Sequence, residues 1–279
     1  MADVPNPYHD PTKAHRRAEG FQNNYVEFQP RSLSELLRWQ RQRLLQGLPP
    51  PAQAPTPRVA PELDWLNANG RAGPGMVPAI CWIGHATVLA QLGGLTLLTD
   101  PVFSQRASPL RHFGPKRHSA PGIVLDRLPH VDLVLVSHNH YDHLDAGSVD
   151  TLNRQPGGPP LFVVPLGLKP WLAGRGIHHA VELDWWERHA LATAGGEVEV
   201  TLVPAQHWSS RSPRDRMATL WGGFAVLAPD CHLLYTGDTA YSRDFRDIRQ
   251  HFSDRQAPER GGGFDIALIP IGAYAPRWF

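Results

Sequence analysis

Three histidines and one aspartate are crowded into six positions, 138–143, of the segment 137–145, which reads SHNHYDHLD. They are His138, His140, Asp142 and His143. The segment follows the apolar run VDLVLV, which is typical of a buried strand, and it precedes a helix start. Neutral imidazoles and carboxylates are the ligands expected for Zn²⁺ and similar ions. A lone histidine is more often structural, but four ligand-type side chains within six positions predict a metal site.

The spacing within this segment favours two ions. Alternate side chains of an extended chain point the same way, so His138 and His140 can hold one ion from a single edge. If Asp145 caps the following helix, the chain must turn before it. That turn can direct Asp142 and His143 at a second ion beside the first.

Two further ligand-type residues each follow a strand-like run. They are His207 in TLVPAQHWSS and Asp238 in HLLYTGDTA. The chain has 15 histidines, so His207 alone is a weak candidate, and Asp238 could equally be a turn residue. Because ligands at strand ends can converge on one edge of a sandwich, we expect both to join the site.

The pattern HxHxDH, followed by a later histidine and a GDT aspartate, resembles the metallo-β-lactamase fold. That fold is an α/β structure, an αββα sandwich whose strand-end loops hold one or two metal ions. Longer segments are similar to the N-acylphosphatidylethanolamine-hydrolysing phospholipase D family and its bacterial relatives, over nearly everything from residue 80 onward. These segments are WIGHATVLAQLGGLTLLTDPVFSQRASPLRHFGPKRH (82–118), SHNHYDHLD, PAQHWSSR (204–211), GDTAY (237–241) and IPIGAYAPRWF (269–279).

The resemblance implies a ligand set for two zinc ions. It places one zinc on His138, His140 and His207. It places the other zinc on Asp142 and His143, with Asp238 between the two ions. Asp142 or Asp238 would also serve catalysis, by orienting the nucleophile or accepting its proton.

Five other residues occupy family positions near the site, and each has an ordinary alternative role. His85 in GHAT and Asp100 in TDP would orient ligand imidazoles, although His85 could cap a turn and Asp100 could simply end a strand before Pro101. Three aromatic residues would line an apolar channel for lipid tails, or else belong to the core. They are Trp208, Tyr241 and Tyr274.

One family ligand has no counterpart in this chain. The family has a further histidine on the second zinc, downstream of the segment that matches GAYAPRWF, and this sequence ends at Phe279. Either the sequence is a fragment that lacks the last elements of the domain, or fewer protein groups hold the second ion. We therefore expect the second zinc to bind more weakly than the first. In a fragment, the predicted buried strand FDIALIPIG would lose cover, and the exposed apolar patch would promote association, for example as a homodimer.

The elements that must position these residues fall into two regions. Residues 1–78 are rich in proline and are expected to wrap over a core formed later. Within them, RSLSELLRWQRQRLLQGLPP predicts one basic amphipathic helix, with a capping box at Ser32 and Glu35 and a stop at Gly47 and Pro49. Its leucines at helical spacing are Leu33, Leu36, Leu37, Leu44 and Leu48, and its arginines are Arg31, Arg38, Arg41 and Arg43. The arginines would suit an anionic lipid surface, but packing of the helix on its own domain is the favoured alternative.

Residues 79–279 are expected to form the metallo-β-lactamase-fold domain. Their short β-rich runs are nearly continuous in apolar residues, which predicts sheets covered on both faces. The runs are 79–84, 87–92, 95–100, 131–138, 161–165, 198–205, 222–229, 232–238 and 264–272. The segments 145–154 and 241–252 are predicted to be helices.

Composition excludes several classes of function. The formal net charge of +1 argues against nucleic acid as a partner. Cys81 and Cys231 are the only cysteines, and without a secretory signal they favour reduced core residues and a cytoplasmic location. No apolar run approaches the roughly 20 residues that span a bilayer, so any membrane association should be peripheral.

The expected function is metal-dependent phosphodiester hydrolysis of phospholipase D type. The resemblance implies a phospholipid substrate, N-acylphosphatidylethanolamine, with phosphatidic acid and an N-acylethanolamine as products. Two alternatives remain open at this point. One is a small-molecule lactone or cyclic-phosphate hydrolase on the same fold, and the other is a non-catalytic metal-binding protein.

Overall fold

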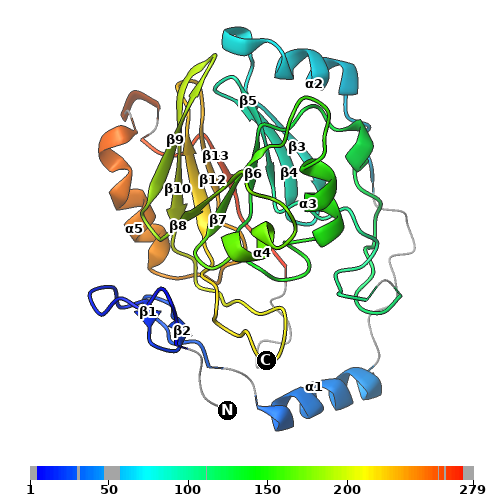
Figure 1. Cartoon of the computed structure of the whole chain (residues 1–279), viewed down its shortest axis with the longest axis vertical. Coiled ribbons are helices and arrows are strands. Elements are labelled where there is room, and N and C mark those ends of the chain that lie inside the picture. The colour runs from blue at the N-terminus through cyan, green and yellow to red at the C-terminus, as the bar shows by residue number, and fades with distance from the viewer. Residues whose placement is uncertain are drawn as a thin grey trace.

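The structure is a computed structural model that describes residues 5–29, 32–46, 57–110, 112–256, 258–260 and 262–272. Two β-sheets pack face to face, and helices cover their outer faces (Figure 1). This is the αββα sandwich that the resemblance implied.

The first sheet has the strand order β3-β4-β5-β6-β7-β8. Its strands are β3 (Ala79–Gly84), β4 (Thr87–Leu92), β5 (Leu95–Thr99), β6 (Leu133–Leu135), β7 (Leu161–Pro165) and β8 (Ala180–Leu183). β3, β4 and β5 pair antiparallel, whereas β5 to β8 run parallel. On the outer face lie α2 (Leu63–Gly70), α3 (Ala146–Leu152) and α4 (Lys169–Ala173).

The second sheet has the order β13-β12-β11-β10-β9. Its strands are β9 (Arg188–Thr193), β10 (Gly196–Val203), β11 (Gly223–Leu227), β12 (His232–Tyr235) and β13 (Ile266–Leu268). β9 to β12 are antiparallel, and β13 runs parallel to β12. Helix α5 (Asp244–His251) covers its outer face. Single 3₁₀ turns lie at Gly73–Gly75, Leu125–Arg127, Ser253–Arg255 and Pro258–Arg260.

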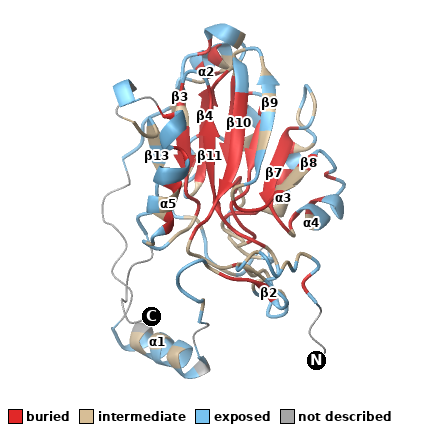
Figure 2. Cartoon of the chain, turned by 90° about the vertical axis from the view of Figure 1, so that its left-hand side faces the viewer, coloured by how far each residue is buried: buried red, intermediate tan, exposed pale blue. Residues whose placement is uncertain are grey.

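Alternate residues of the inner strands face the two sides of the sheet, as expected for a sandwich with helices on its outer faces. In β6, Leu133 and Leu135 face the core between the sheets, and Val134 faces the helices of the outer layer. β4, β5, β7 and β11 are buried along their whole length, as the continuous apolar runs predicted (Figure 2). Phe252 and Ile248 close the opposite outer face at α5.

Strand direction explains where a site can form. β5 and β6 are parallel, so their carboxyl ends share one edge of the first sheet. β10 and β12 are both antiparallel to β11, so their carboxyl ends share one edge of the second sheet. The loops that follow these four strands carry Asp100, the 138–143 segment, His207 and Asp238.

The predicted helices and strands agree with the structure at most positions. The runs 79–84, 87–92 and 161–165 are strands with those bounds, and α3 and α5 lie in the two predicted helical segments. Several short elements were not predicted: α2, α4, β8, β9 and the hairpin of β1 (Arg16–Arg17) and β2 (Gly20–Phe21). β9 alternates between exposed and half-buried positions. Its apolar residues are only alanine and leucine, and polar residues flank them, so its sequence does not resemble the continuous apolar runs of the buried strands.

Residues 5–29 pack against the end of the sandwich. Phe21 belongs to the core between the sheets. The carboxylate of Asp184, which is fully buried, accepts contacts from Lys13 at 2.6 Å, His15 at 2.7 Å and Arg16 at 2.7 Å. A single buried charge therefore anchors this part of the N-terminal segment through three partners.

Helix α1 (Leu33–Gln46) forms where it was predicted, with the capping box intact. The Ser32 amide donates to Glu35 Oε2 at 2.8 Å, and the Glu35 amide donates to Ser32 Oγ at 3.3 Å. Among the residues that the structure describes, the favoured packing of this helix on its own domain is not seen. α1 lies apart from the sandwich (Figures 1 and 2), and its leucines are turned to solvent: Leu36, Leu37, Leu44 and Leu45. The predicted stop at Gly47 and Pro49, together with Leu48 and Arg31, falls outside the described residues, as do the side chains of Leu33 and Arg43.

The strand predicted within 264–272 forms as β13, but the prediction that it is buried is wrong. Ile266 and Leu268 are half-buried and Ala267 is exposed. Within the described residues β13 pairs only with β12, so it is an edge strand with little cover. Ile269 and Ile271 beside it are 53% and 90% exposed, which leaves an apolar patch on the surface.

Candidate metal centre

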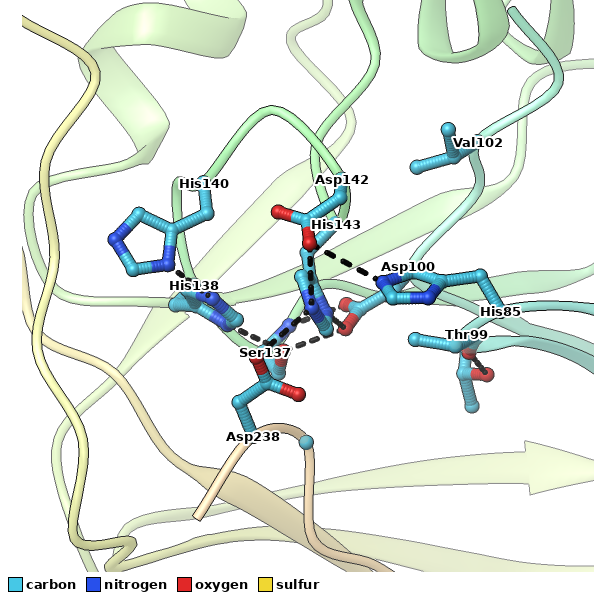
Figure 3. A network of polar contacts seen from close by, with 12 residues as sticks. His85, Thr99, Asp100, Val102, Ser137, His138, His140, Asp142, His143 and Asp238 are labelled. Atoms are coloured by element: carbon cyan, nitrogen blue, oxygen red, sulfur yellow. Dashed lines mark hydrogen bonds and ion pairs between the residues drawn. The ribbon is translucent and has the colours of Figure 1, made fainter. Parts of the chain in front are cut away.

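A tight turn separates the ligand-type residues of the 137–145 segment into two pairs. The amides of His143 and Leu144 both donate to the carbonyl of His140, at 3.1 and 2.8 Å. Asp145 then caps α3, as predicted, by accepting a hydrogen bond from the Ser148 amide. His138 and His140 therefore lie on one side of the turn, and Asp142 and His143 lie on the other (Figure 3).

The first group consists of three imidazoles that converge on one point. His138 Nε2 lies 2.9 Å from His140 Nδ1, and His207 Nε2 lies 3.2 Å from each of those two atoms. Three nitrogens bound to one tetrahedral Zn²⁺ at about 2.05 Å would be about 3.3 Å apart, so the triangle has nearly the size that a shared ion requires.

The protonation of this group suits a cation. Burial lowers the pKa of His138 well below its ordinary value, lowers the pKa of His140 to about 4 and lowers the pKa of His207 to about 3. All three rings are therefore neutral at pH 7. Three neutral imidazoles whose ring nitrogens converge on one point are a ligand set for a divalent ion.

The second group contains Asp142, His143 and Asp238. Asp142 Oδ2 lies 3.9 Å from His143 Nε2. Asp238 Oδ2 lies 3.2 Å from His143 Nε2 and 3.8 Å from His207 Nε2, so this carboxylate stands between the two groups. Burial would raise the pKa of Asp142 and of Asp238. Contacts with His85 and His143 outweigh burial at Asp142, and contacts with His143 and His207 outweigh it at Asp238, so the pKa of each carboxyl lies below its usual range.

Asp100 holds His143 through the ring nitrogen Nδ1, on the side away from the site. This buried carboxylate accepts hydrogen bonds from His143 Nδ1 at 2.6 Å, from the Ser137 amide at 2.6 Å, from Ser137 Oγ at 2.5 Å and from the Tyr235 hydroxyl. Its φ of 32° lies in the left-handed region, which non-glycine residues rarely adopt and which recurs at functional sites. The contact directs Nε2 of His143 into the site, as in carboxylate–histidine–metal arrangements.

The surroundings of His143 Nε2 favour positive charge. This buried Nε2 faces the Asp238 carboxylate at 3.2 Å as an ion pair, without hydrogen-bond geometry to any of the described residues. Burial alone would lower the pKa of His143, but Asp100 and Asp238 outweigh it and raise that pKa to about 10. The surroundings thus favour a positive charge at this atom. The ligand atoms of His138, His140 and His207 lie within reach of one ion, as do those of His85, Asp142 and His143, so the residues present fit divalent metal ions.

Of the remaining predicted residues, His85 and Trp208 contact proposed ligands, whereas Tyr241 does not line the site. His85 sits in the β3–β4 turn with a φ of 52°, and its Nε2 lies 3.2 Å from Asp142 Oδ2. Trp208 packs edge-on against His140, with ring centroids 4.5 Å apart. Tyr241 is 95% exposed and stacks on Phe245, away from the cavity described below. Tyr274 is outside the described residues.

A cavity of about 1760 Å³ opens from the centre toward α2 and the 102–122 loop. His85, His140 and Asp142 form part of its wall. Its aromatic and aliphatic lining includes Trp65, Trp82, Ile83, Val102, Tyr141 and Trp208, and its cationic lining includes Arg58, Lys116, Arg117 and Arg127. Its volume exceeds the roughly 300–1,000 Å³ that is usual for small-molecule sites.

Two residues that support the ligand turn and His207 were not predicted from the sequence. Arg211 donates from Nη1 to the carbonyls of Asn139 and Leu144, at 2.8 Å each, and its guanidinium lies 4.0 Å from the centre of the Tyr141 ring. It thereby holds both ends of the ligand turn. The other is Asn23, which bonds to the backbone of His207. Arg211 stands in the quoted PAQHWSSR segment, but no spacing rule links it to the turn, and nothing in the sequence links residue 23 to residue 207.

The family is established by comparison with known proteins. The model of the beta-lactamase superfamily domain matches residues 96–279, and the chain therefore belongs to this superfamily. Together with the αββα sandwich and the histidine-rich strand-end site, the match defines the metallo-β-lactamase type.

Its relatives narrow the resemblance. The chain is 40% identical over 205 residues to N-acyl-phosphatidylethanolamine-hydrolyzing phospholipase D 1 of Caenorhabditis elegans, which covers 71% of this chain and 54% of that protein. It is 35% identical to the mitochondrial N-acyl-phosphatidylethanolamine-hydrolyzing phospholipase D of Saccharomyces cerevisiae, over 71% of this chain and 40% of that protein. An uncharacterized protein of Mycobacterium tuberculosis is 37% identical over 79% of this chain and 56% of its own length. The chain thus spans about half the length of these relatives.

Proposed function

We propose that this protein is a metal-dependent phosphodiesterase of phospholipase D type. Its substrate would be an N-acylphosphatidylethanolamine-like phospholipid, and its products would be phosphatidic acid and an N-acylethanolamine. Water would attack phosphorus, the bond from phosphorus to the ethanolamine oxygen would break, and the departing oxygen would take up a proton. The superfamily, the two groups of ligands and the named relatives support this proposal.

The ligands divide into two sets. His138, His140 and His207 would hold one zinc ion, and Asp142 and His143 would hold the other, with Asp238 shared. Two divalent ions would supply a water of lowered pKa as the nucleophile and would neutralise charge on the phosphate oxygens. The ionised carboxylates of Asp142 and Asp238 can orient that water and accept its proton.

The observation that carries the choice of substrate is the cavity. It joins the metal-ligand groups to a wall rich in tryptophan, which suits acyl chains, and to arginine and lysine side chains, which suit a phosphate. A small lactone or cyclic phosphate would leave most of about 1760 Å³ unfilled.

A hydrolysis screen on zinc-loaded protein tests the proposal. N-acylphosphatidylethanolamine in vesicles, bis(p-nitrophenyl) phosphate and a sugar lactone would be compared, with products identified by mass spectrometry. We expect release of N-acylethanolamine from the vesicles. Turnover of only the small phosphodiester or the lactone would point to the alternative hydrolase. Zinc binding with no turnover of any substrate would point to a non-catalytic metal-binding protein.

Peripheral contact with a membrane is part of the proposal. None of the described helices is long and apolar enough to cross a bilayer. α1 carries exposed leucines beside Arg38 and Arg41, a composition that suits the surface of an anionic membrane. In a vesicle sedimentation assay we expect more protein to pellet with anionic vesicles than without them. Leu37→Glu with Leu44→Glu should reduce that fraction, and equal recovery in the supernatant throughout would contradict membrane contact.

A further inference from the structure

The backbone of His207 is held by one side chain from the distant N-terminal segment. Asn23 Oδ1 accepts a hydrogen bond from the His207 amide at 3.0 Å, and Asn23 Nδ2 donates to the His207 carbonyl at 3.0 Å. The two residues are 184 positions apart in sequence. The carboxamide therefore satisfies both backbone groups of His207 at once, as a neighbouring strand would.

Among the described residues, no strand pairs with the backbone of His207. β10 ends at Val203, four residues earlier, and the chain then leaves the sheet. The neighbouring residue Gln206 forms an isolated bridge with Ala240, but His207 does not belong to it. The buried Trp221 reinforces the arrangement, because its indole N–H lies 2.8 Å from the Ala205 carbonyl and 3.2 Å from Asn23 Oδ1.

The same segment reaches a second ligand through an aromatic contact. Phe28 stacks on Trp208, with centroids 5.2 Å apart and an interplanar angle of 16°. Trp208 in turn packs edge-on against His140 at 4.5 Å. Two of the three imidazoles of the first group are thus supported by residues 23–28.

The segment is itself fixed to the sandwich on both sides of Asn23. Upstream, three side chains bind the buried Asp184. Downstream, Asn24 Nδ2 donates to Asp244 Oδ1 at 2.9 Å, and the Tyr25 hydroxyl contacts Asp247, both on α5. Asn23 can therefore act as a fixed support rather than as a side chain on a loose tail.

We propose that Asn23 is a positioning residue for the first metal site, which it serves by fixing the backbone, and so the imidazole, of His207. This inference rests on the proposed role of His207 as a metal ligand. Side chains that orient metal ligands typically change metal affinity about 10- to 100-fold when removed. The segment before the sandwich is on this account a structural part of the metal centre.

The test compares Asn23→Ala with Asn24→Ala, a neighbouring asparagine that makes one hydrogen bond to α5 and none to a ligand residue. Zinc affinity of the first site would be measured by competition with a chelator, and the visible spectrum of the cobalt-loaded protein would report the geometry. We expect Asn23→Ala to weaken first-site affinity about 10-fold or more and to alter the spectrum. Asn24→Ala should leave both unchanged, although each variant loses some thermal stability.

Two further variants, His207→Ala and Asn23→Asp, separate a failure of the positioning role from a failure of the metal site. His207→Ala should lose first-site affinity outright, and an unchanged affinity in that variant would overturn the proposed metal site itself. If His207→Ala loses affinity while Asn23→Ala matches Asn24→Ala, only the positioning role is overturned. If Asn23→Ala does not fold, Asn23→Asp decides. It keeps the volume and the acceptor but loses the donor, and affinity equal to wild type would refute the proposal.

Discussion

At the residue scale, the candidate centre depends on side chains outside the proposed ligand sets. Asp100 fixes His143 through Nδ1, and Arg211 ties the carbonyls of Asn139 and Leu144 together across the ligand turn. The clustering of His138, His140, Asp142 and His143 could be predicted from the sequence, because HxHxDH lies within six consecutive positions. The role of Asp100 was also expected, because TDP is a segment of the family pattern. The role of Arg211 was not, because Arg211 lies in another loop and shares only spatial proximity with the carbonyls it holds.

Replacement of Arg211 by Ala should loosen the ligand turn. Two carbonyls lose a charged donor, so we expect a loss of roughly 2–3 kcal/mol in stability and weaker zinc binding in both groups. Chemical denaturation and chelator competition measure the two effects. Arg214→Ala, an exposed arginine in the same loop, is the matched control. Equal behaviour of the two variants would argue against a role for Arg211 in holding the turn.

At the element scale, buried strands were easier to predict than edge strands and short helices. β4, β5 and β7 are covered on both faces, so their apolar composition alone identifies them. The edge strand β9 is half-exposed, and the five-residue helix α4 is too short to show helical periodicity. α1 was predicted correctly as a helix, but the position of a helix relative to the sandwich depends on contacts that its own sequence does not specify.

The attachment of the N-terminal segment to the β8–β9 turn should depend on pH. Burial would raise the pKa of Asp184, but hydrogen bonds from His15, Lys13 and Arg16 outweigh it and hold that pKa well below its ordinary value. The stabilisation is therefore complete above about pH 4 and is lost as the pH falls further, toward the folded-state pKa.

Asp184→Asn tests this attachment. We expect the variant to be about 3 kcal/mol less stable than wild type at pH 7, because three cations lose a buried counter-charge. In urea unfolding as a function of pH, the gap should narrow below pH 4. Glu187→Gln, at a half-exposed carboxylate beside the same cations, should cost about 0.5 kcal/mol or less. A gap between Asp184→Asn and wild type that stays constant down to pH 2 would refute the linkage.

At the scale of the whole molecule, metal binding should stabilise the fold. The ligands come from loops that follow strands of both sheets, so an ion bound among them links the two halves of the sandwich. Ligand that binds only the folded state adds about 4 kcal/mol at 1,000 times its Kd. Calorimetry with increasing zinc should raise Tm, and EDTA should return it to the metal-free value. A Tm that is insensitive to both would contradict binding between the sheets.

The exposed patch around β13 should cause self-association. Ile269 and Ile271 are exposed beside a poorly covered edge strand, and patches of this kind favour contact between copies. Sedimentation velocity should show an average mass that rises with protein concentration. Ile271→Asp should lower that dependence, and an unchanged monomer at all concentrations would show that the patch does not mediate association.

The most direct test of the metal centre is a zinc titration of the wild-type protein and of the double variant His138→Ala, His140→Ala. In wild type we expect two zinc ions per chain, with the site of three imidazoles filling at lower zinc concentration than the site of Asp142, His143 and Asp238. The double variant should lose the tighter site while circular dichroism remains native. Unchanged zinc content in the folded double variant would contradict the assignment of this strand-end cluster as a metal centre.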